Sequence, residues 1–224
     1  ITNVSTPEFI GTGEAGATIT FVINDQTYTT DVDVNGNWSL QISGALGDDS
    51  YTYNVTAADD AGNSETQSGS ITIDTVVNLT SNLTSLSDTG VSATDGITQD
   101  TTPSFVGKAD VGATVILEIN DRSYTTQADD LGDWALSVAD ALSDGPYNYQ
   151  IIATDIAGNE TSQNSSITID TESPNLTGRL SASDDSGTSD TDNITSVTLP
   201  TFTGNGEAGT QVLLNIAGTS YETT

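Results

Sequence analysis

The chain repeats itself at an interval of 96 to 97 residues, and no other feature constrains its fold as strongly. The motif that opens with Pro7-Glu8-Phe9-Ile10-Gly11 returns at Pro103 and again at Pro200. The register also holds for single residues and short motifs: Gly16, Gly112 and Gly209; Tyr28, Tyr124 and Tyr221; Trp38 and Trp134; Asp59–Asn63 and Asp155–Asn159; Ile71–Thr75 and Ile167–Thr171. Agreement at so many positions means that the chain consists of copies of one structural module.

One copy has the length of an immunoglobulin-like sandwich, with turn signals every several residues. Thr, Ser, Val, Ile, Gly, Asn and Asp dominate the sequence, and no long window carries apolar residues at helical spacing. We therefore expect an all-β fold of tandem immunoglobulin-like β-sandwich modules in an elongated rod. Module 1 is expected to span residues 1–75, module 2 residues 76–171 and module 3 residues 172–224.

Repeat register also says which parts of each module are present. Ile1 corresponds to Ile97, so module 1 is expected to lack its first strand. Thr224 corresponds to Gln127, so module 3 is expected to hold only its N-terminal part. No signal peptide, lipidation motif or apolar run of membrane-spanning length is present, and we expect a fragment from the middle of a longer protein. The missing strands are expected to come from residues beyond these ends or from another chain.

Within module 2, the sequence predicts seven strands, near 78–85, 103–108, 113–120, 122–128, 133–138, 146–154 and 163–169. In the third of these, apolar residues alternate with their neighbours, which places Ala113, Val115, Leu117 and Ile119 on one inward face. Asn and Asp tolerate positive φ, so Asn24-Asp25 and Asn120-Asp121 are expected to form two-residue hairpin turns.

The aromatic residues are interpreted as structural. Trp38 and Trp134 each open a strand just after a glycine, and we expect them to anchor the core. Tyr51 and Tyr147 follow polar loops in the setting of a tyrosine corner, in which the hydroxyl binds back to the loop's backbone.

The charge balance excludes several classes of partner. The chain has 32 acidic residues against three basic ones, for a formal net charge of -29. Nucleic acid is excluded as a partner, and membrane insertion is not expected, because basic clusters and apolar spans are both lacking. Aspartate outnumbers glutamate 24 to 8, which suits turns and hard cations, although a salt-adapted surface is a competing explanation.

Enzymatic activity is not expected. The chain has no cysteine, histidine or methionine, so thiol and imidazole chemistry are removed together. Paired carboxylates serve glycosidases, but the acidic residues here fall in turns of small sandwiches with no indicated concave pocket.

The whole chain resembles the bacterial immunoglobulin-like tandem repeats of giant type I secreted, RTX-type repetitive adhesins. The matching motifs are Thr-Pro-Ser-Phe-Val-Gly (102–107), Val-Gly-Ala-Thr-Val (111–115), Leu-Gly-Asp-Trp (131–134), Ala-Leu-Ser-Asp-Gly-Pro-Tyr (141–147), Ala-Thr-Asp-Ile-Ala-Gly-Asn (153–159) and Ile-Thr-Ile-Asp-Thr (167–171). The segments 87–98 and 185–195 resemble the family's inter-repeat segment. The resemblance implies an extracellular rod on the bacterial surface that supports adhesion or biofilm formation, with calcium stiffening its junctions.

Topology gives a separate reason to expect calcium between modules. Loops at the exit pole of one sandwich face loops at the entry pole of the next. Stacking would therefore bring Asp48, Asp49 and Asp74 of module 1 near Asp110, Asp129 and Asp155 of module 2. Several converging carboxylates repel one another unless a divalent cation neutralises them, and Ca²⁺ accepts six to eight oxygen ligands. The candidate metal ligands are Asp48, Asp49, Asp59, Asp74, Asp88, Asp95, Asp110, Asp129, Asp144, Asp155, Asp170, Asp185 and Asp192. The alternative is that these aspartates cap turns and face water.

Two local patterns limit the calcium hypothesis. The segment 31–36 opens like an EF-hand loop, but the twelfth position is Ile42 instead of Glu, so we interpret it as a hairpin turn. Asp100 of module 2 is replaced by Val197 in module 3, which argues against one ligand set shared by every module.

Two functions fit the sequence. In the first, the modules form a passive, calcium-stiffened stalk whose partners are the neighbouring repeats, while a host or surface receptor is bound elsewhere in the protein. In the second, the chain is a self-assembling extracellular filament or surface-layer subunit, completed by strand exchange with other copies.

Overall fold

The structure is a computed structural model that describes residues 1–90 and 92–224. Its regular elements are all β-strands, so the expected all-β class is confirmed. Among the described residues there is no helix long and apolar enough to cross a membrane. The chain divides into two compact units, Ile1–Asp170 and Thr171–Thr224, and each is described by itself.

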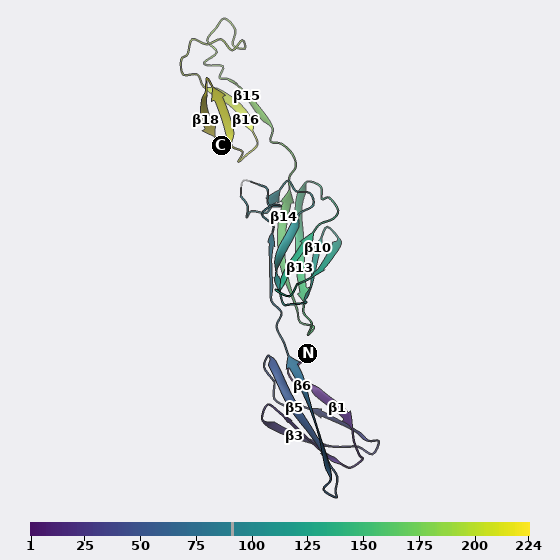
Figure 1. Cartoon of the computed structure of the whole chain (residues 1–224). Helices are drawn as coiled ribbons and strands as arrows, with labels where there is room; N and C mark the ends of the chain where they lie inside the picture. The colour runs from purple at the N-terminus through teal and green to yellow at the C-terminus, as the bar shows by residue number, and fades with distance from the viewer. Residues whose placement is uncertain (91) are drawn as a thin grey trace. The chain divides into compact units, whose positions relative to one another are not determined.

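Module 1 contains six strands in two sheets. They are β1 (Glu8–Thr12), β2 (Thr18–Ile23), β3 (Gln26–Asp31), β4 (Asn37–Gln41), β5 (Asp49–Ala58) and β6 (Ser64–Ile73). One sheet has the order β3-β2-β5-β6, and the other pairs β1 with β4. Thr2 adds a parallel bridge to Ile73 at the edge of β6. Figure 1 shows the long antiparallel β5 and β6 of this module.

The described residues of module 2 form the seven expected strands and one more. They are β7 (Leu79–Leu83), β8 (Ile97–Thr98), β9 (Ser104–Ala109), β10 (Thr114–Ile119), β11 (Arg122–Gln127), β12 (Asp133–Ser137), β13 (Gly145–Thr154) and β14 (Glu160–Ile169). One sheet has the order β11-β10-β13-β14-β8 and the other β12-β9-β7. Figure 1 labels β10, β13 and β14 of the first sheet. The sequence did not predict β8, a two-residue strand that pairs in parallel with β14.

The core of module 2 lies between these two sheets. The inward face predicted for β10 is confirmed, because Ala113, Val115 and Leu117 are fully buried and Ile119 nearly so. From the other sheet, Phe105 of β9 and Trp134 of β12 join the same cluster. Phe105 is fully buried and Trp134 is 3% exposed, so the predicted role of Trp134 as a core anchor is confirmed.

The predicted turns and tyrosine corners are present. Asn24, Asp25, Asn120 and Asp121 have φ angles of 49°, 57°, 51° and 55°, the left-handed pair that a two-residue hairpin turn requires. The Tyr51 hydroxyl donates to the Gly47 carbonyl at 3.1 Å, and the Tyr147 hydroxyl donates to the Ser143 carbonyl at 3.0 Å. Trp38 of module 1 is partly buried against its core, in agreement with the prediction.

The interpretation of segment 31–36 as a hairpin turn was wrong. β3 pairs with β2, and β4 pairs with β1, so this segment carries the chain from one sheet to the other. Asp33 shapes the connection, because its Oδ1 accepts hydrogen bonds from the amides of Asn35 and Asn37 at 2.8 and 2.9 Å. Turn composition alone does not distinguish a hairpin from a connection between sheets, because both need the same capping groups.

The unit Thr171–Thr224 contains two pairs of antiparallel strands. β15 (Leu176–Leu180) pairs with β16 (Phe202–Gly206), and β17 (Val212–Ile216) pairs with β18 (Thr219–Thr223). Leu180 is 8% exposed, whereas Phe202 is 41% and Leu213 53% exposed. The sheet fragments of this unit therefore bury little apolar surface among themselves.

Candidate metal-binding acidic loops

The linker after module 1 is held by side chains from both of the modules that it joins. Asp48, just before β5, accepts from the Thr75 amide at 3.0 Å and from the Thr75 hydroxyl at 2.8 Å. Asp110, after β9, accepts from the Asn78 amide and from the Asn78 side-chain amide, both at 3.1 Å. The carboxylate oxygens of these acids thus accept hydrogen bonds from the linker. The sequence pattern of acidic turns does not reveal these partners.

A third anchor of the linker is the Asp-x-x-Gly-Asn turn between β13 and β14. Asp155 Oδ1 accepts from the amides of Ala157 and Asn159, both at 2.8 Å. The Asn159 side-chain amide donates to Asp155 Oδ2 and to the Asp74 carbonyl, each at 2.7 Å. Asn159 was not predicted to be functional, although its place in the repeated motif marks it. It ties module 2 to the linker.

Electrostatics at this turn favour the ionised acid. Burial of Asp155, which is 8% exposed, raises its carboxyl pKa, but hydrogen bonds from Asn159 and Ala157 outweigh that effect. The pKa therefore lies below its ordinary value of 3.8. In module 1, hydrogen bonds from the side chain and amide of Asn63 likewise lower the pKa of Asp59.

Other predicted ligands also accept backbone hydrogen bonds. The amides of Asp133 and Leu131 donate to Asp129 Oδ1 at 2.9 and 2.8 Å and lower the pKa of its carboxyl. Asp49 accepts from the Ser50 amide at 2.7 Å. Asp144 precedes β13 and Asp170 follows β14, so they flank one pair of strand ends. Both make interactions with neighbouring groups.

No three acidic side chains come together anywhere in the part of the chain that the structure describes. The six acids predicted to converge at the junction instead accept hydrogen bonds from amides or hydroxyls. These acids are Asp48, Asp49 and Asp74 of module 1 and Asp110, Asp129 and Asp155 of module 2. A carboxylate that accepts two hydrogen bonds retains lone pairs, so calcium at the junction stays a prediction.

Asp88 and Asp95 lie in the loop between β7 and β8, named here the 86–98 loop. Asp88 is 6% exposed, and its Oδ1 has no hydrogen-bond partner. The Asp88 amide donates to the Thr84 carbonyl at 2.9 Å, and Asp95 Oδ1 accepts from the Ile97 amide at 3.0 Å.

The equivalent 183–195 loop of module 3 has the same local geometry. Asp185 is 7% exposed, and its Oδ1 also lacks a partner. Its amide donates to the Ser181 carbonyl at 3.0 Å, and Asp192 Oδ1 accepts from the Ile194 amide at 3.0 Å. The two loops therefore agree in how each places its pair of acids.

The replacement of Asp100 by Val197 has a structural explanation. In module 2, the Ser87 hydroxyl donates to Asp100 Oδ2 at 2.7 Å and accepts from the Ser104 amide at 2.9 Å. In module 3, Asp184 stands at the position of Ser87, and its Oδ2 accepts from the Thr201 amide at 2.6 Å. Each module thus keeps one carboxylate beside this strand end, and the two substitutions compensate each other.

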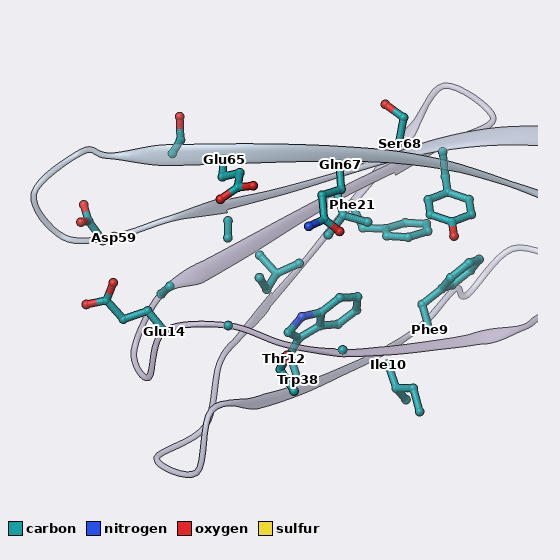
Figure 2. Close-up of a pocket in the computed structure, with 18 of the residues that line it drawn as sticks. Phe9, Ile10, Thr12, Glu14, Phe21, Trp38, Asp59, Glu65, Gln67 and Ser68 are labelled. Carbon is teal, nitrogen blue, oxygen red and sulfur yellow. The ribbon is translucent and has the colours of Figure 1, made fainter.

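Module 1 has an open groove beside β1, shown in Figure 2. The rings of Phe9 and Phe21 lie 4.3 Å apart between the two sheets, with Trp38 near them and Ile10 pointing away. In module 2, β7 pairs with β9 along the equivalent edge, and its Leu79 carbonyl accepts from Gln163 at 2.9 Å. The equivalent Gln67 lines the groove of module 1.

Comparison with known proteins identifies the family to which the chain belongs. The family model for the bacterial Ig-like domain matches three times, at residues 1–75, 76–171 and 173–224. No curated protein sequence matches the chain.

Three solved structures illustrate what the chain resembles. A Ca²⁺-stabilised adhesin with which an Antarctic bacterium binds ice is 29% identical, with a TM-score of 0.40, over 99% of this chain and 58% of that one. A tetra-tandem repeat from the extending region of a large adhesion protein is 24% identical, with a TM-score of 0.39, over 80% and 50%. Part of a 1.5-MDa bacterial ice-binding adhesin is 23% identical, with a TM-score of 0.37, over 99% and 76%. The chain thus spans 58% of the first of these proteins and 50% of the second.

Proposed function

Because the chain belongs to the bacterial Ig-like domain family, we propose that its modules are structural extender repeats in the stalk of a bacterial cell-surface adhesin. The stalk lies outside the cell, carries no catalytic site and holds a separate binding domain away from the surface, in support of adhesion or biofilm formation. Calcium at the junctions stiffens it. The partners of these modules are the neighbouring repeats of the same chain.

The observation that carries this proposal is the way the linker is held. A flexible linker leaves its polar groups to water, whereas residues 74–78 give hydrogen bonds to Asp48 of module 1 and Asp110 of module 2 and receive one from Asn159. The charge-assisted bonds to Asp48 and Asp110, together with the neutral bond from Asn159, restrict the backbone on both sides of the joint. A joint restricted from both sides transmits extension, as a stalk requires.

The rest of the described surface fits a spacer. The ion pairs involve the two basic residues of module 2, Lys108 with Asp133 at 2.8 Å and Arg122 with Asp140 at 3.2 Å, so they form no basic patch. A net charge of -29 keeps copies of such a chain apart in solution. Neither feature recruits an anionic ligand.

Distance measurements between spin labels test the stalk. The chain has no cysteine, so Thr52→Cys and Thr125→Cys give one label on module 1 and one on module 2. We expect a narrow distance distribution in calcium that broadens with a chelator, because loss of the ion loosens the joint. A broad distribution in both conditions would contradict a stiff stalk, and a narrow one in both would remove the role of calcium while keeping the stalk.

A second candidate is a strand-exchanged filament, in which a strand such as β7 of another copy would lie in the groove beside β1. β7 and β15 are the first strands of modules 2 and 3, so they are the strands that would fit this groove. Both are already paired within their own modules, β7 with β9 and β15 with β16. Strand exchange would therefore require one module to release a strand to another chain. Light scattering during gel filtration separates the candidates: a monomer over a wide concentration range supports the stalk, and concentration-dependent polymers support the filament.

A further inference from the structure

The connection that carries module 1 from β3 to β4 contains the pair Asn35-Gly36. An asparagine followed by glycine is prone to cyclise onto its own main chain, because glycine has no side chain to obstruct its backbone nitrogen. In repeat register the counterpart in module 2 is Leu131-Gly132, which has no side-chain amide. This chemistry is therefore open to module 1 and closed to module 2 at the same place in the fold.

We propose that Asn35-Gly36 is a self-modification site, at which Asn35 converts to aspartate and isoaspartate without an enzyme. The Gly36 backbone nitrogen gives its proton to hydroxide from the solvent and attacks the side-chain carbonyl carbon of Asn35. A new C–N bond closes a succinimide ring, the C–NH2 bond breaks, and the leaving nitrogen takes a proton from water and departs as ammonia. Water then opens the ring at one of its two carbonyls. One product is aspartate, and the other is isoaspartate, whose main chain runs through the former side chain.

The pair is accessible to solvent and lies outside the strand ladders of module 1. Asn35 is exposed, and Val34 before it is 91% exposed. β3 ends at Asp31 and β4 begins at Asn37, so strand pairing does not fix the backbone between them. Exposed segments of this kind open locally at a far lower free energy than a whole domain. Local opening is enough to bring the Gly36 nitrogen to the Asn35 side chain.

Asp33 holds this turn closed and so limits the rate. The Gly36 amide donates to the Asp33 carbonyl at 3.0 Å, which engages the attacking nitrogen in the closed turn. Asp33 Oδ1 accepts from the amides of Asn35 and Asn37 at 2.8 and 2.9 Å. Hydrogen bonds, first that from the Asn37 amide, lower the pKa of the Asp33 carboxyl. The ionised carboxylate also opposes loss of a proton from the nearby Gly36 nitrogen. Asp33 is therefore a positioning residue that slows the conversion.

The chain has one other Asn-Gly pair, Asn205-Gly206, in a different setting. Both residues lie in β16, where Asn205 is paired with Thr177 and Gly206 with Leu176 of β15. The Asn205 amide donates to the Thr177 hydroxyl at 3.2 Å, and the Asn205 carbonyl accepts from that hydroxyl at 3.4 Å. Rotation of the backbone at Asn205 breaks the strand pairing, so we expect Asn205 to react more slowly than Asn35.

Conversion of Asn35 loosens the crossing between the two sheets of module 1. The Gly36 carbonyl accepts from the Gly13 amide at 3.0 Å, and a Cβ on Gly36 would lie 3.1 Å from the Gly13 carbonyl oxygen. The two segments thus approach closely. Isoaspartate adds a methylene to the main chain, which displaces Gly36 from Gly13 and from Asp33. Either product also adds a negative charge beside Asp33. Module 1 is therefore expected to lose stability with time, while module 2 keeps its stability.

Exchange of the reactive residue between the modules tests the proposal. The full chain is kept folded at mildly alkaline pH, peptide mass mapping locates the converted residues, and released ammonia counts them. In the unsubstituted chain, residue 35 should convert several-fold faster than residue 205, and the rate should rise with pH. Asn35→Leu should end conversion at this position. Leu131 is 77% exposed, so Leu131→Asn should fold normally and create a second reactive pair in the matching turn of module 2.

A further variant tests the part played by Asp33. Asp33→Asn keeps a side-chain oxygen for the amides of Asn35 and Asn37 but removes the charge, so conversion of residue 35 should become faster. The urea midpoint of module 1, read from Trp38 fluorescence in a Trp134→Phe background, shows whether the variant remains folded during the incubation. After conversion of the Asp33-containing chain, this midpoint should fall, and that of module 2 should not change.

Three results would each overturn the proposal. In the first, residue 35 converts in urea but stays intact in the folded chain, which means that the closed turn blocks the reaction. In the second, residue 205 converts as fast as residue 35, which means that the local fold does not select the site. In the third, residue 131 of the Leu131→Asn chain stays intact while residue 35 converts.

Discussion

The linker contact of Asn159 yields a prediction with a matched control inside the same chain. Asn159→Ala deletes two hydrogen bonds of 2.7 Å, one to Asp155 Oδ2 and one to the Asp74 carbonyl. A hydrogen bond to a charged group contributes about 1.5–3 kcal/mol and a neutral one about 1 kcal/mol. Asp155 is 8% exposed, so water replaces little of what is lost. We expect Asn159→Ala to destabilise module 2 by about 2–3 kcal/mol.

The control is Asn63→Ala in module 1. Asn63 makes the same 2.7 Å bond to Asp59 Oδ2, but among the described residues it makes no bond to a linker. Asp59 is also more accessible to water than Asp155, so solvent compensates more of the loss. We expect a clearly smaller effect from Asn63→Ala than from Asn159→Ala.

Module-specific fluorescence makes the two effects measurable. Module 1 holds Trp38 and module 2 holds Trp134, so Trp38→Phe and Trp134→Phe backgrounds each report one module in urea. With a denaturant slope of about 1–2 kcal/mol per M, the Asn159 effect of about 2–3 kcal/mol corresponds to a midpoint shift of roughly 1–3 M. Equal shifts for Asn159→Ala and Asn63→Ala, each against its own background, would refute the role assigned to the linker bond.

Three further predictions concern module 2. Hydrogen bonds lower the pKa of the Asp155 carboxyl below 3.8, so the ionised carboxylate stabilises the folded module fully above that pH. This stabilisation is lost as the pH falls through the folded-state pKa. Asp155→Asn should therefore lower the urea midpoint of module 2 at pH 7, and lower it less at pH 3. Gly107→Ala places a Cβ 1.9 Å from the Thr80 carbonyl oxygen, so β7 must separate from β9, with a loss of about 3 kcal/mol and faster hydrogen exchange in β7; unchanged exchange would contradict this. Ser87→Asp alone sets a second carboxylate beside that of Asp100 and should destabilise module 2. Adding Asp100→Val should recover about 1–3 kcal/mol, and additive effects of the two substitutions would rule out compensation.

Much of the fold was predictable from the sequence because it depends on local signals repeated in register. Period-two alternation placed β10 and its buried face, and Asn120-Asp121 placed the hairpin turn that follows it. β8 was missed because a two-residue strand has too few residues for periodicity to reveal. Segment 31–36 was misassigned because its turn residues serve a hairpin and a crossing between sheets equally well.

For the candidate metal ligands, the sequence gave the residue type but not the hydrogen-bond partners of each carboxylate. It marked Asp48, Asp110 and Asp155 as acids of Asp-rich turns, and the structure showed which amides each of them binds. Whether ions lie among the junction acids, and whether the modules form a rod, remain predictions.

The sequence by itself determined that this protein is a series of β-sandwich modules, because repeat spacing, alternation and turn residues are properties that a chain carries along its length. Only the tertiary structure decided that Asp88 and Asp185 are buried, each with one carboxylate oxygen that has no partner, while Asp95 and Asp192 are exposed. The physical reason is that burial and hydrogen-bond partners depend on which segments meet in space. For these two acids, the chain must fold into its loop before one carboxylate oxygen of each is separated from water.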